Sequence, residues 1–426
     1  MRYIPRIIDD VLDTYLGIFG AVNIRGPKWC GKTTSAEQKA KSVLRLQDPD
    51  YSDLYRQTAS VKPSLLLKGD NPRLIDEWQD IPELWDAVRV DTDQRKGAVG
   101  LYLLTGSSVI TKKQKERIRH TGTGRIARLE MLPMSLYESG DSNGKISLSA
   151  LFGDPLMDID GISSSLAIED LIALTCRGGW PENIGKSSSA AKIIAHQYVK
   201  GLCESDVSRY LDEEFDPSIL HSMLKSYARN IATLATKQSM MKDVGISEPT
   251  FDRYEKALES LYIVSNIPAW DSQIRSKSAM RAKEKRNLVD PSIAIAALGI
   301  NPEYFYTDLK SFGFLFECLA IRDLKVYSSS MDGSISYYRD SYGLEADAVL
   351  HLNDGRYALV EFKLGASGID AGKKHLREIK DLIIKYNNSN EQTPLRLPDL
   401  LIVMTATGIA YRDGDVLVIP LTTLKN

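Results

Sequence analysis

The sequence predicts an α/β protein of several domains, and three observations lead to this prediction. In the first third, short apolar runs alternate with helical segments, which is typical of a parallel sheet with helices on both faces. From about residue 163 the pattern turns helical, and from about Phe312 strands return. At 426 residues the chain is too long for one ordinary core, and the usual domain size predicts about two to four domains.

Composition excludes some classes of protein. The 54 basic and 56 acidic side chains give a net charge of −2, so bulk charge neither favours nor excludes nucleic acid. The cysteines lie far apart, which excludes a closely spaced thiolate metal site and fits a reducing compartment. Aspartates interrupt the N-terminal stretch MRYIPRIIDDVLDTYLG, and no apolar run is long enough for a bilayer. We therefore expect a cytoplasmic protein without a membrane partner. The cysteines are Cys30, Cys176, Cys203 and Cys318.

The first elements in chain order are a strand at 18–24, a helix at 32–46, a strand at 72–76, a helix from about Ile81 and a strand at 99–105. A strand, a crossover helix and a second strand form the unit from which parallel sheets are built. This part of the chain is therefore expected to form a parallel sheet.

The middle of the chain begins after a polar break at 138–145. The region 163–211 is helical in pattern, and further helical periods end in the strand-like segment 261–267 (LYIVSNI). Helices followed by a small hairpin favour a winged-helix-like module, with a plain helical connector as the alternative. From Phe312 the expected order is helix, strand, strand, strand, helix, strand.

The stretch GPKWCGKTT fits the phosphate-loop pattern at every fixed position. Its glycines allow backbone N–H groups to surround phosphates, Lys32 reaches the β- and γ-phosphate oxygens, and Thr33 offers a hydroxyl to Mg²⁺. Because the loop follows an apolar strand and begins a helix, we expect it to bind ATP. The expected nucleotide-contacting residues are Gly26, Pro27, Lys28, Trp29, Cys30, Gly31, Lys32, Thr33 and Thr34.

Two further strands end in polar residues. The apolar run before Asp76 and Glu77 delivers two adjacent carboxylates to the sheet edge. Asp76 is expected to hold magnesium, and Glu77 to orient or deprotonate the attacking water. The segment LLTGSS places Thr105 between the two earlier motifs, where it can touch the γ-phosphate or the water, with helix capping by Ser107 or Ser108 as the alternative. Together these motifs predict ATP hydrolysis.

The segments GPKWCGKTT, PRLIDEWQ, LLTGSS and HTGTGRIARLEMLPMSLYESG resemble a large prokaryotic family of AAA+ ATPases with a C-terminal domain of unknown function. The later segments RGGWPE, KRNLVDPSIA and EADAVLHL…YALVEFKLG also match its layout, so the resemblance covers essentially the whole chain. It implies an AAA+ P-loop NTPase core at 1–155, a helical lid at 156–215, a winged-helix-like segment at 216–290 and a C-terminal α/β domain at 291–426.

The resemblance also implies further nucleotide contacts. Arg125 and Arg128 lie where AAA+ proteins place an arginine that stabilises transition-state charge, sometimes across the boundary of a homo-oligomer. A surface arginine is the equally weighted alternative. Gly179 and Pro181 resemble the turn that caps adenine, and Arg177 beside them is a candidate phosphate sensor. A plain lid corner is the alternative. The N-terminal segment Tyr3–Arg6 is a further candidate for packing against the base.

The C-terminal strands carry a second constellation, with Asp347 on one strand and Glu361 and Lys363 on its partner. Residues two apart on a strand project from the same face, so Glu361 and Lys363 point into one site. This segment resembles the restriction-endonuclease-like PD-(D/E)XK fold, although Ala346 stands where the proline of that motif would be. Asp347, Glu361 and the preceding Glu317 are expected to hold Mg²⁺ or Mn²⁺, with Lys363 steadying the attacking water. An inert domain retained for docking is the alternative.

A basic run, QIRSKSAMRAKEKR at 273–286, joins the middle of the chain to its C-terminal part. Such a run is usually solvated, but here contact with a phosphate backbone is a fair rival. The leading hypothesis is an AAA+ ATPase that controls a nuclease-like domain acting on DNA or RNA through its C-terminal half. The main alternative is a nucleotide-gated signalling or scaffold protein. A small-molecule kinase explains only the phosphate loop.

Overall fold

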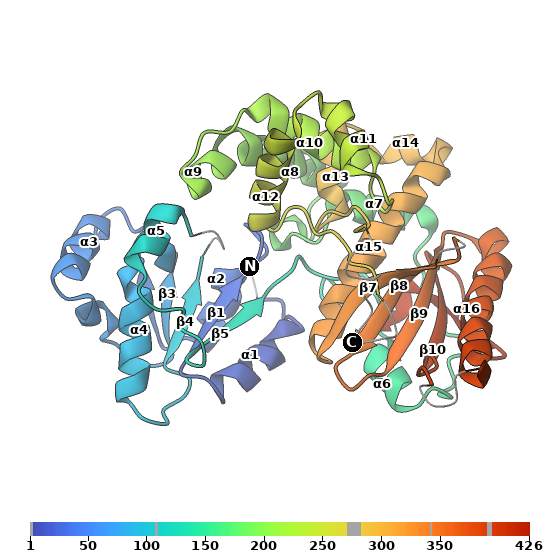
Figure 1. Cartoon of the computed structure of the whole chain (residues 1–426), viewed down its shortest axis with the longest axis horizontal. Coiled ribbons are helices and arrows are strands. Elements are labelled where there is room, and N and C mark those ends of the chain that lie inside the picture. The colour runs from blue at the N-terminus through green and yellow to red at the C-terminus, as the bar shows by residue number, and fades with distance from the viewer. Residues whose placement is uncertain (1–2, 107–109, 271–282, 341–342, 390–393) are drawn as a thin grey trace.

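The computed structural model of the chain describes residues 3–106, 110–270, 283–340, 343–389 and 394–426. It has two lobes, each built around a β-sheet, and a helical part that joins them along one side (Figure 1). Within these residues no helix is both long and apolar enough to cross a membrane. Ser107, Ser108 and most of the basic run at 273–286 lie outside the described residues.

The N-terminal lobe contains a five-stranded sheet in the order β2-β3-β4-β1-β5, and all of its strands are parallel. The expected parallel α/β sheet is therefore confirmed. Because parallel strands share one carboxyl edge, the residues that follow β1, β3 and β4 meet there. The strands are β1 (Ala21–Arg25), β2 (Ser42–Arg45), β3 (Arg73–Asp76), β4 (Tyr102–Thr105) and β5 (Ile126–Glu130).

Helices cover both faces of this sheet because the apolar side chains alternate along its strands. On β1, Val22 and Ile24 pack in the apolar cluster of α1 and α2, whereas Ala21 packs in that of α4. The helices of this lobe are α1 (Ile8–Leu16), α2 (Lys32–Lys39), α3 (Ser52–Val61), α4 (Glu83–Gln94) and α5 (Lys112–Arg117).

The single helix expected at 32–46 is wrong in its second half. Helix α2 ends at Lys39, and the chain then turns into the edge strand β2, which pairs with β3. Val43 and Leu44 fit a helical period after Ala36 and Ala40, but they serve equally well as a short strand. Pairing with β3 supplies the backbone hydrogen bonds that decide between the two.

The helical part follows residue 163 and includes the helical segments that the sequence predicts there. The segment after α12 pairs with residues 285–288 only through isolated antiparallel bridges, Val264 with Leu288 and Ile267 with Lys285. Helix α13, with which the expected C-terminal domain begins, packs against α8 and α10 and also contacts α15. The helices are α7 (Ile168–Arg177), α8 (Ser188–Gly201), the π-helix Leu202–Asp206, α9 (Val207–Leu211), α10 (Pro217–Arg229), α11 (Lys237–Val244), α12 (Glu248–Ser260), α13 (Pro291–Leu298) and α14 (Pro302–Thr307).

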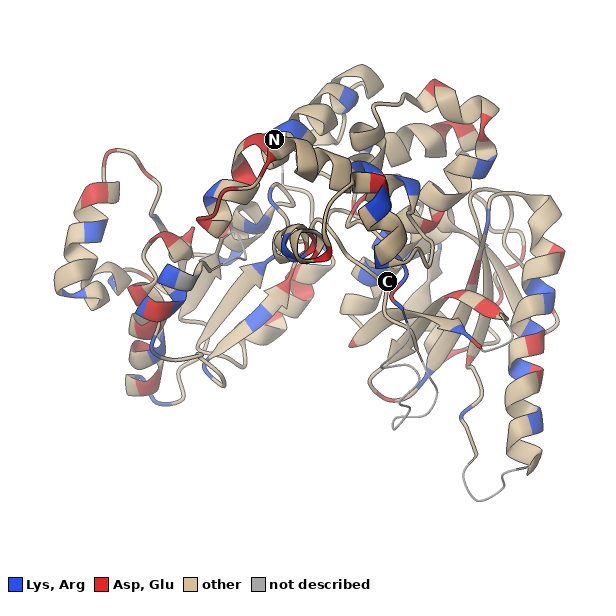
Figure 2. Cartoon of the chain, turned by 45° about the horizontal axis from the view of Figure 1, so that its top comes forward, with Lys and Arg blue, Asp and Glu red and all other residues tan. Residues whose placement is uncertain are grey.

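The C-terminal lobe contains a separate mixed sheet of six strands in the order β11-β12-β10-β9-β8-β7. Helix α15 packs on one face and α16 on the other, and the core beneath α15 continues into the helical part. Basic and acidic residues are interspersed over both lobes (Figure 2). The elements are α15 (Leu309–Ser329), β7 (Gly333–Arg339), β8 (Glu345–Leu352), β9 (Tyr357–Lys363), α16 (Ile369–Ser389), β10 (Leu400–Thr405), β11 (Tyr411–Asp413), β12 (Val416–Pro420) and β13 (Leu424–Lys425).

The segment at 142–163, which lies between the N-terminal sheet and the helical part in sequence, is packed into the C-terminal lobe. Its short strand β6 (Ile146–Ser147) pairs in parallel with β13, and helix α6 (Leu148–Gly153) lies beside the C-terminal sheet (Figure 1). Arg356 donates to the carbonyl of Phe152 (2.7 Å). The polar break at 138–145 therefore marks a crossing between lobes.

Candidate functional site

The phosphate loop connects β1 to α2 and has the backbone shape that its glycines allow. Gly26 and Gly31 have φ of 147° and 101°, which side chains rarely permit. A Cβ atom on Gly26 would lie 2.0 Å from the carbonyl oxygen of Met131. Lys32 is buried and donates to the carbonyls of Gly26 (2.9 Å) and Pro27 (2.8 Å), so its ammonium lies within the loop.

Three predicted residues meet at one oxygen atom. The Thr33 hydroxyl donates to Oδ1 of Asp76 (2.8 Å), and the Thr105 hydroxyl donates to the same oxygen (2.6 Å). These side chains come from α2, β3 and β4, whose ends lie together at the carboxyl edge of the sheet. A hydroxyl beside a carboxylate provides the oxygen ligands that Mg²⁺ prefers, so the arrangement fits a nucleotide-bound magnesium ion.

Glu77 follows Asp76 in the left-handed region, with φ of 56°, and accepts a hydrogen bond from Gln79. A non-glycine residue in this region costs free energy and is held only where the surroundings demand it. Its carboxylate lines the same cavity as Lys32 and Thr33. The backbone therefore turns at Glu77 and brings this residue to the cavity beside the loop.

Two adjoining cavities surround the loop, and they share Gly31, Thr34, Pro181 and Glu182. The larger one, of about 800 Å³, contains Lys32, Thr33 and Glu77 and suits the phosphates. The other, of about 480 Å³, is lined by apolar and polar side chains from the N-terminus, α2 and the turn at Pro181, and it suits a base. Its lining residues include Tyr3, Ile4, Arg6, Ser35, Gln38 and Met134.

The structure distinguishes between the predicted lid residues. Pro181 lines both cavities, whereas Gly179 holds the turn in place, since its N–H donates to Asp290 (2.8 Å) and its carbonyl accepts from Met134 (2.6 Å). Arg177 does not line either cavity. It pairs with Asp141 (2.5 Å), because it lies at the end of α7 facing the polar break.

Sequence reasoning missed several side chains around the nucleotide cavity. Arg209 of α9 lines the larger cavity, and Lys28 of the phosphate loop pairs with Asp206 (2.9 Å) of the helical part. Arg6 donates to the carbonyl of Cys30 (2.9 Å) in the phosphate loop and pairs with Glu138 (3.0 Å). The N-terminal segment therefore helps to fix the position of the loop. Only a basic charge on a lid helix could have indicated Arg209, and many residues share that signal.

The C-terminal constellation lies where β8 and β9 separate. A step of two positions along β7, from Ser336 to Tyr338, corresponds to a step of three positions along β8, from Val349 to Ala346. This irregularity is a β-bulge, a feature that re-aims side chains beside many active sites. It leaves Asp347 at the gap, where its Oδ2 accepts the backbone N–H of Phe362 (2.8 Å).

Two lysines are interleaved with the acids of this cluster. Lys363 donates to Glu361 (2.5 Å) and lies 3.8 Å from Oδ2 of Asp347, as the strand spacing predicts. Lys285, which sequence reasoning did not single out, is only 1% exposed. Its Nζ lies 2.9 Å from Glu317, 2.9 Å from Glu345 and 3.9 Å from Asp347.

The electrostatics follow from burial and from these neighbours. Burial raises the pKa of Glu317 to about 8, against the opposing effect of Lys285, and burial with the nearby Asp347 raises the pKa of Glu361 to about 7. For Lys285 burial alone would lower the pKa, but Glu317, Asp347 and Glu345 outweigh it and raise the pKa. Glu317 and Glu361 therefore hold a proton more readily than free carboxyl groups do.

The expected convergence of Glu317, Asp347 and Glu361 on one metal ion needs correction. Carboxylates are the correct donors for a hard cation. Within the described residues, however, no three acid, histidine or cysteine side chains are placed to hold a metal together. The ammonium of Lys285 lies on the side of Asp347 that faces Glu317, whereas Glu361 lies with Lys363. With Lys285 in this position the cluster does not fit a metal ion.

Comparisons with known proteins agree with part of this picture. Residues 19–140 match the family model described as an AAA domain, whereas residues 168–304 and 312–424 match two domains of unknown function, DUF8612 and DUF4143. No curated protein matches the chain.

Two solved structures are similar to the chain. The Walker-type ATPase PABY2304 of Pyrococcus abyssi is 13% identical, with a TM-score of 0.43, covering 68% of this chain and 94% of its own. A variant of RuvB from Thermotoga maritima is 16% identical, with a TM-score of 0.27, covering 61% and 89%.

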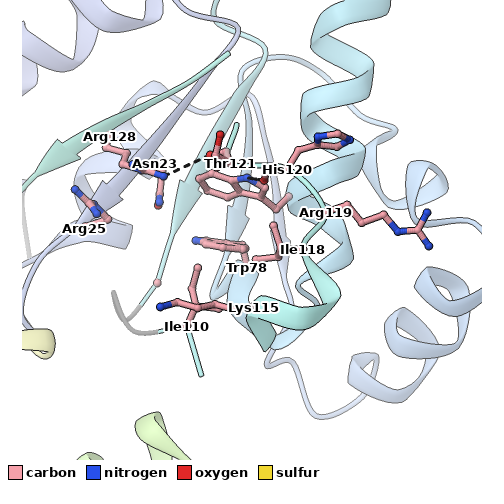
Figure 3. A pocket seen from close by; sticks show the side chains of 12 residues that line it. Asn23, Arg25, Trp78, Ile110, Lys115, Ile118, Arg119, His120, Thr121 and Arg128 are labelled. Atoms are coloured by element: carbon pink, nitrogen blue, oxygen red, sulfur yellow. Dashed lines mark hydrogen bonds between the residues drawn. The ribbon is translucent and has the colours of Figure 1, made fainter. Parts of the chain in front are cut away.

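Residues 19–140 are therefore similar to AAA domains, and this region is called the AAA domain below. Its two candidate arginines lie away from its own nucleotide cavities. Arg125 pairs with Asp93, and Arg128 donates to the carbonyl of Thr121 (3.4 Å) in a separate cavity of about 330 Å³. Figure 3 shows Arg128 and Arg25 on neighbouring strands of this cavity, with Trp78 between them and Lys115. In this conformation neither arginine can therefore contact a nucleotide bound at the phosphate loop of the same chain.

We expect Arg128→Ala to keep ATP binding and to lose most of its turnover, because an arginine supplied by a second subunit acts only on transition-state charge. ATPase activity per mole of wild-type protein should also rise with protein concentration. Steady-state assays over a dilution series, paired with a binding titration, measure both effects. Arg95→Ala, which removes a surface arginine of the AAA domain that pairs with Asp91, is the control. Activity that is strictly proportional to concentration down to monomeric dilution would argue against assembly.

We expect Glu77→Gln to keep nucleotide binding and to lower turnover by roughly a hundredfold, the usual loss for an acid–base group. The amide keeps the shape of the side chain but removes the charge that activates water. Parallel measurements of ATP affinity and of kcat separate the two effects. Glu83→Gln, near the same sheet edge but paired with Arg117, is the matched control. An equal loss of binding and turnover would make Glu77 a structural residue.

Proposed function

We propose that ATP binding and hydrolysis in the AAA domain control a nuclease-like C-terminal domain that acts on DNA or RNA. The observation that carries the proposal is the grouping of Asp347, Glu361 and Lys363 at the gap between β8 and β9. The proposed division into an AAA core, a helical lid, a winged-helix-like segment and a nuclease-like domain goes with it, as does a homo-oligomer that shares Arg125 or Arg128.

In the AAA domain the residues have separate tasks. Lys32 exchanges its loop carbonyls for the β- and γ-phosphate oxygens, and the loop N–H groups bind the same charge. A magnesium ion at Thr33 and Asp76 would neutralise the phosphates. Thr105 keeps the Asp76 carboxylate oriented, and Glu77 takes the proton of the attacking water.

In the C-terminal domain, Lys363 lies beside Asp347 and Glu361 with its ammonium half-buried. Both carboxylates raise the pKa of Lys363 although burial lowers it, so it stays charged and suits a phosphate oxygen or a developing negative charge. Part of the basic run is committed to other contacts. Lys285 is buried, and Arg286 pairs with Glu255 (2.7 Å), so neither is a free phosphate ligand.

A second function, a nucleotide-gated scaffold with an inert nuclease-like domain, is favoured by one observation. Lys285 and Lys363 offset much of the negative charge of the acidic cluster. Such a cluster is stable without a metal, and a retained fold can then serve only to bind a partner.

Cleavage assays distinguish the two functions. Purified protein would be incubated with single- and double-stranded DNA and with RNA, with and without ATP, and with Mg²⁺ or Mn²⁺. We expect metal-dependent cleavage that changes with ATP. If no nucleic acid is cleaved under any of these conditions while ATP is hydrolysed, the scaffold function is correct.

A further inference from the structure

The position of Lys285 joins two parts of the protein. Its backbone pairs with Ile267 through two hydrogen bonds of 2.9 Å, which fixes it to the segment that follows α12. Its side chain instead reaches the C-terminal lobe, where the ammonium contacts Glu317 of α15 and Glu345 and Asp347 of β8. A charge this deeply buried persists only because the surrounding carboxylates compensate for its lost hydration.

The same segment also holds the nucleotide-binding turn. Five residues after Lys285, Asp290 accepts the N–H of Gly179 (2.8 Å) and pairs with Arg322 (2.9 Å). Ser292 accepts the indole N–H of Trp180 (2.9 Å). Trp180 is followed directly by Pro181, which lines both nucleotide cavities.

Helix α15 contacts the segment 285–292 at two points. It carries both Glu317, which pairs with Lys285, and Arg322, which pairs with Asp290. Arg322 and Asp290 are both almost completely buried, and Asp323 next to Arg322 accepts the N–H of Leu136 (3.0 Å). Two buried ion pairs therefore join the same two elements, one pair at the acidic cluster and one at the turn of the nucleotide cavity.

We propose that Lys285 is the resident cation of the acidic cluster, that it excludes a divalent metal in this conformation, and that the segment 285–292 links its position to the nucleotide cavity. The proposal rests on the proposed role of the C-terminal cluster and names the regulation of that site. An ammonium and a divalent cation compete for the same carboxylates, since each offsets the same negative charge. Movement of the turn at Gly179 on nucleotide binding would shift Asp290, and with it the segment that carries Lys285.

The test measures metal binding and does not depend on cleavage. Mn²⁺ titrations followed by calorimetry and by electron paramagnetic resonance would compare the nucleotide-free wild type with Lys285→Met, which keeps the unbranched apolar stem of the side chain and removes its charge. We expect the variant to gain one Mn²⁺ site at least about tenfold tighter than any in the wild type, and to rise in Tm when Mn²⁺ is added. The Asp347→Asn change in the Lys285→Met background should remove this site.

Lys325→Met is the matched control. Lys325 is a partly buried lysine on α15, and it donates to Ser265 (2.7 Å) and not to the acidic cluster. This variant should gain no Mn²⁺ site. A folded Lys285→Met protein without a gained site, or a wild type with an equally tight Asp347-dependent site, would overturn the proposal.

A second arm uses the wild type and so remains informative if Lys285→Met does not fold. A non-hydrolysable ATP analogue should tighten Asp347-dependent Mn²⁺ binding, with Asp347→Asn giving the contribution of the nucleotide site. No change on adding the analogue would overturn the link through 285–292. Failure of the proposed function would appear separately, as absent ATP hydrolysis or absent cleavage with metal binding unaffected.

Discussion

Lys32→Ala should bind ATP roughly a thousandfold more weakly than the wild type and show no measurable turnover, because charge-assisted hydrogen bonds to two phosphate groups are lost. The fold should survive, since the Lys32 ammonium donates to the carbonyls of Gly26 and Pro27 within the loop itself. Isothermal titration with ATP and Mg²⁺ measures the affinity, and circular dichroism checks the fold.

The matched control for this result is Lys39→Ala. Lys39 lies on the same helix, α2, but at its other end, where it pairs with Asp13 (2.6 Å) on the surface. It should bind and hydrolyse ATP like the wild type. A Lys32→Ala protein that binds and hydrolyses ATP normally would mean that the phosphate loop has been assigned wrongly.

Asp347→Ala should abolish nucleic-acid cleavage while ATP hydrolysis continues at the rate of the wild type. Asp347 is the acid that lies near both lysines of the cluster and accepts the backbone N–H of Phe362. Its loss therefore removes the carboxylate that lies between Lys285 and Lys363. Lys363→Ala should also lose cleavage but should keep the nucleotide-dependent metal binding proposed above, because a cation and not a carboxylate ligand has been removed.

Two measurements on each variant, cleavage of labelled DNA or RNA and release of phosphate from ATP, separate these effects. Asp354→Ala, in the exposed turn between β8 and β9, removes an acid from the same hairpin without touching the cluster and should leave both activities intact. Cleavage retained by Asp347→Ala would place the nuclease chemistry elsewhere.

The nucleotide site shows how much a local pattern can predict. Gly26 and Gly31 have the positive φ that the loop sequence requires, and Thr33, Asp76 and Thr105 meet as the order of strands implies. Each of these positions depends on short-range rules, namely strand alternation, glycine geometry and the shared carboxyl edge of parallel strands. The roles assigned to these residues stay predictions until the variants are measured.

The parts that sequence reasoning missed depend on long-range packing. Arg177 pairs with Asp141 and does not line the nucleotide cavity. Arg209 is the arginine of the helical part that lines it. Lys285 lies in a basic run that suggests a solvated or nucleic-acid-binding loop, yet it is buried among acids distant in sequence. No periodicity in the chain marks such contacts, because they are decided by which lobes the fold brings together.

The pairing of β6 with β13 has a consequence for the order in which the protein folds during synthesis. Ile146 and Ser147 leave the ribosome long before Leu424 and Lys425, which complete their small sheet. Until then Leu148, Leu151 and Phe152, which are buried in the finished protein, lack part of their apolar surroundings. The nascent chain therefore exposes an aggregation-prone apolar stretch just after its AAA domain. A fragment limited to residues 312–424 would expose the apolar surface of the C-terminal lobe that this stretch covers.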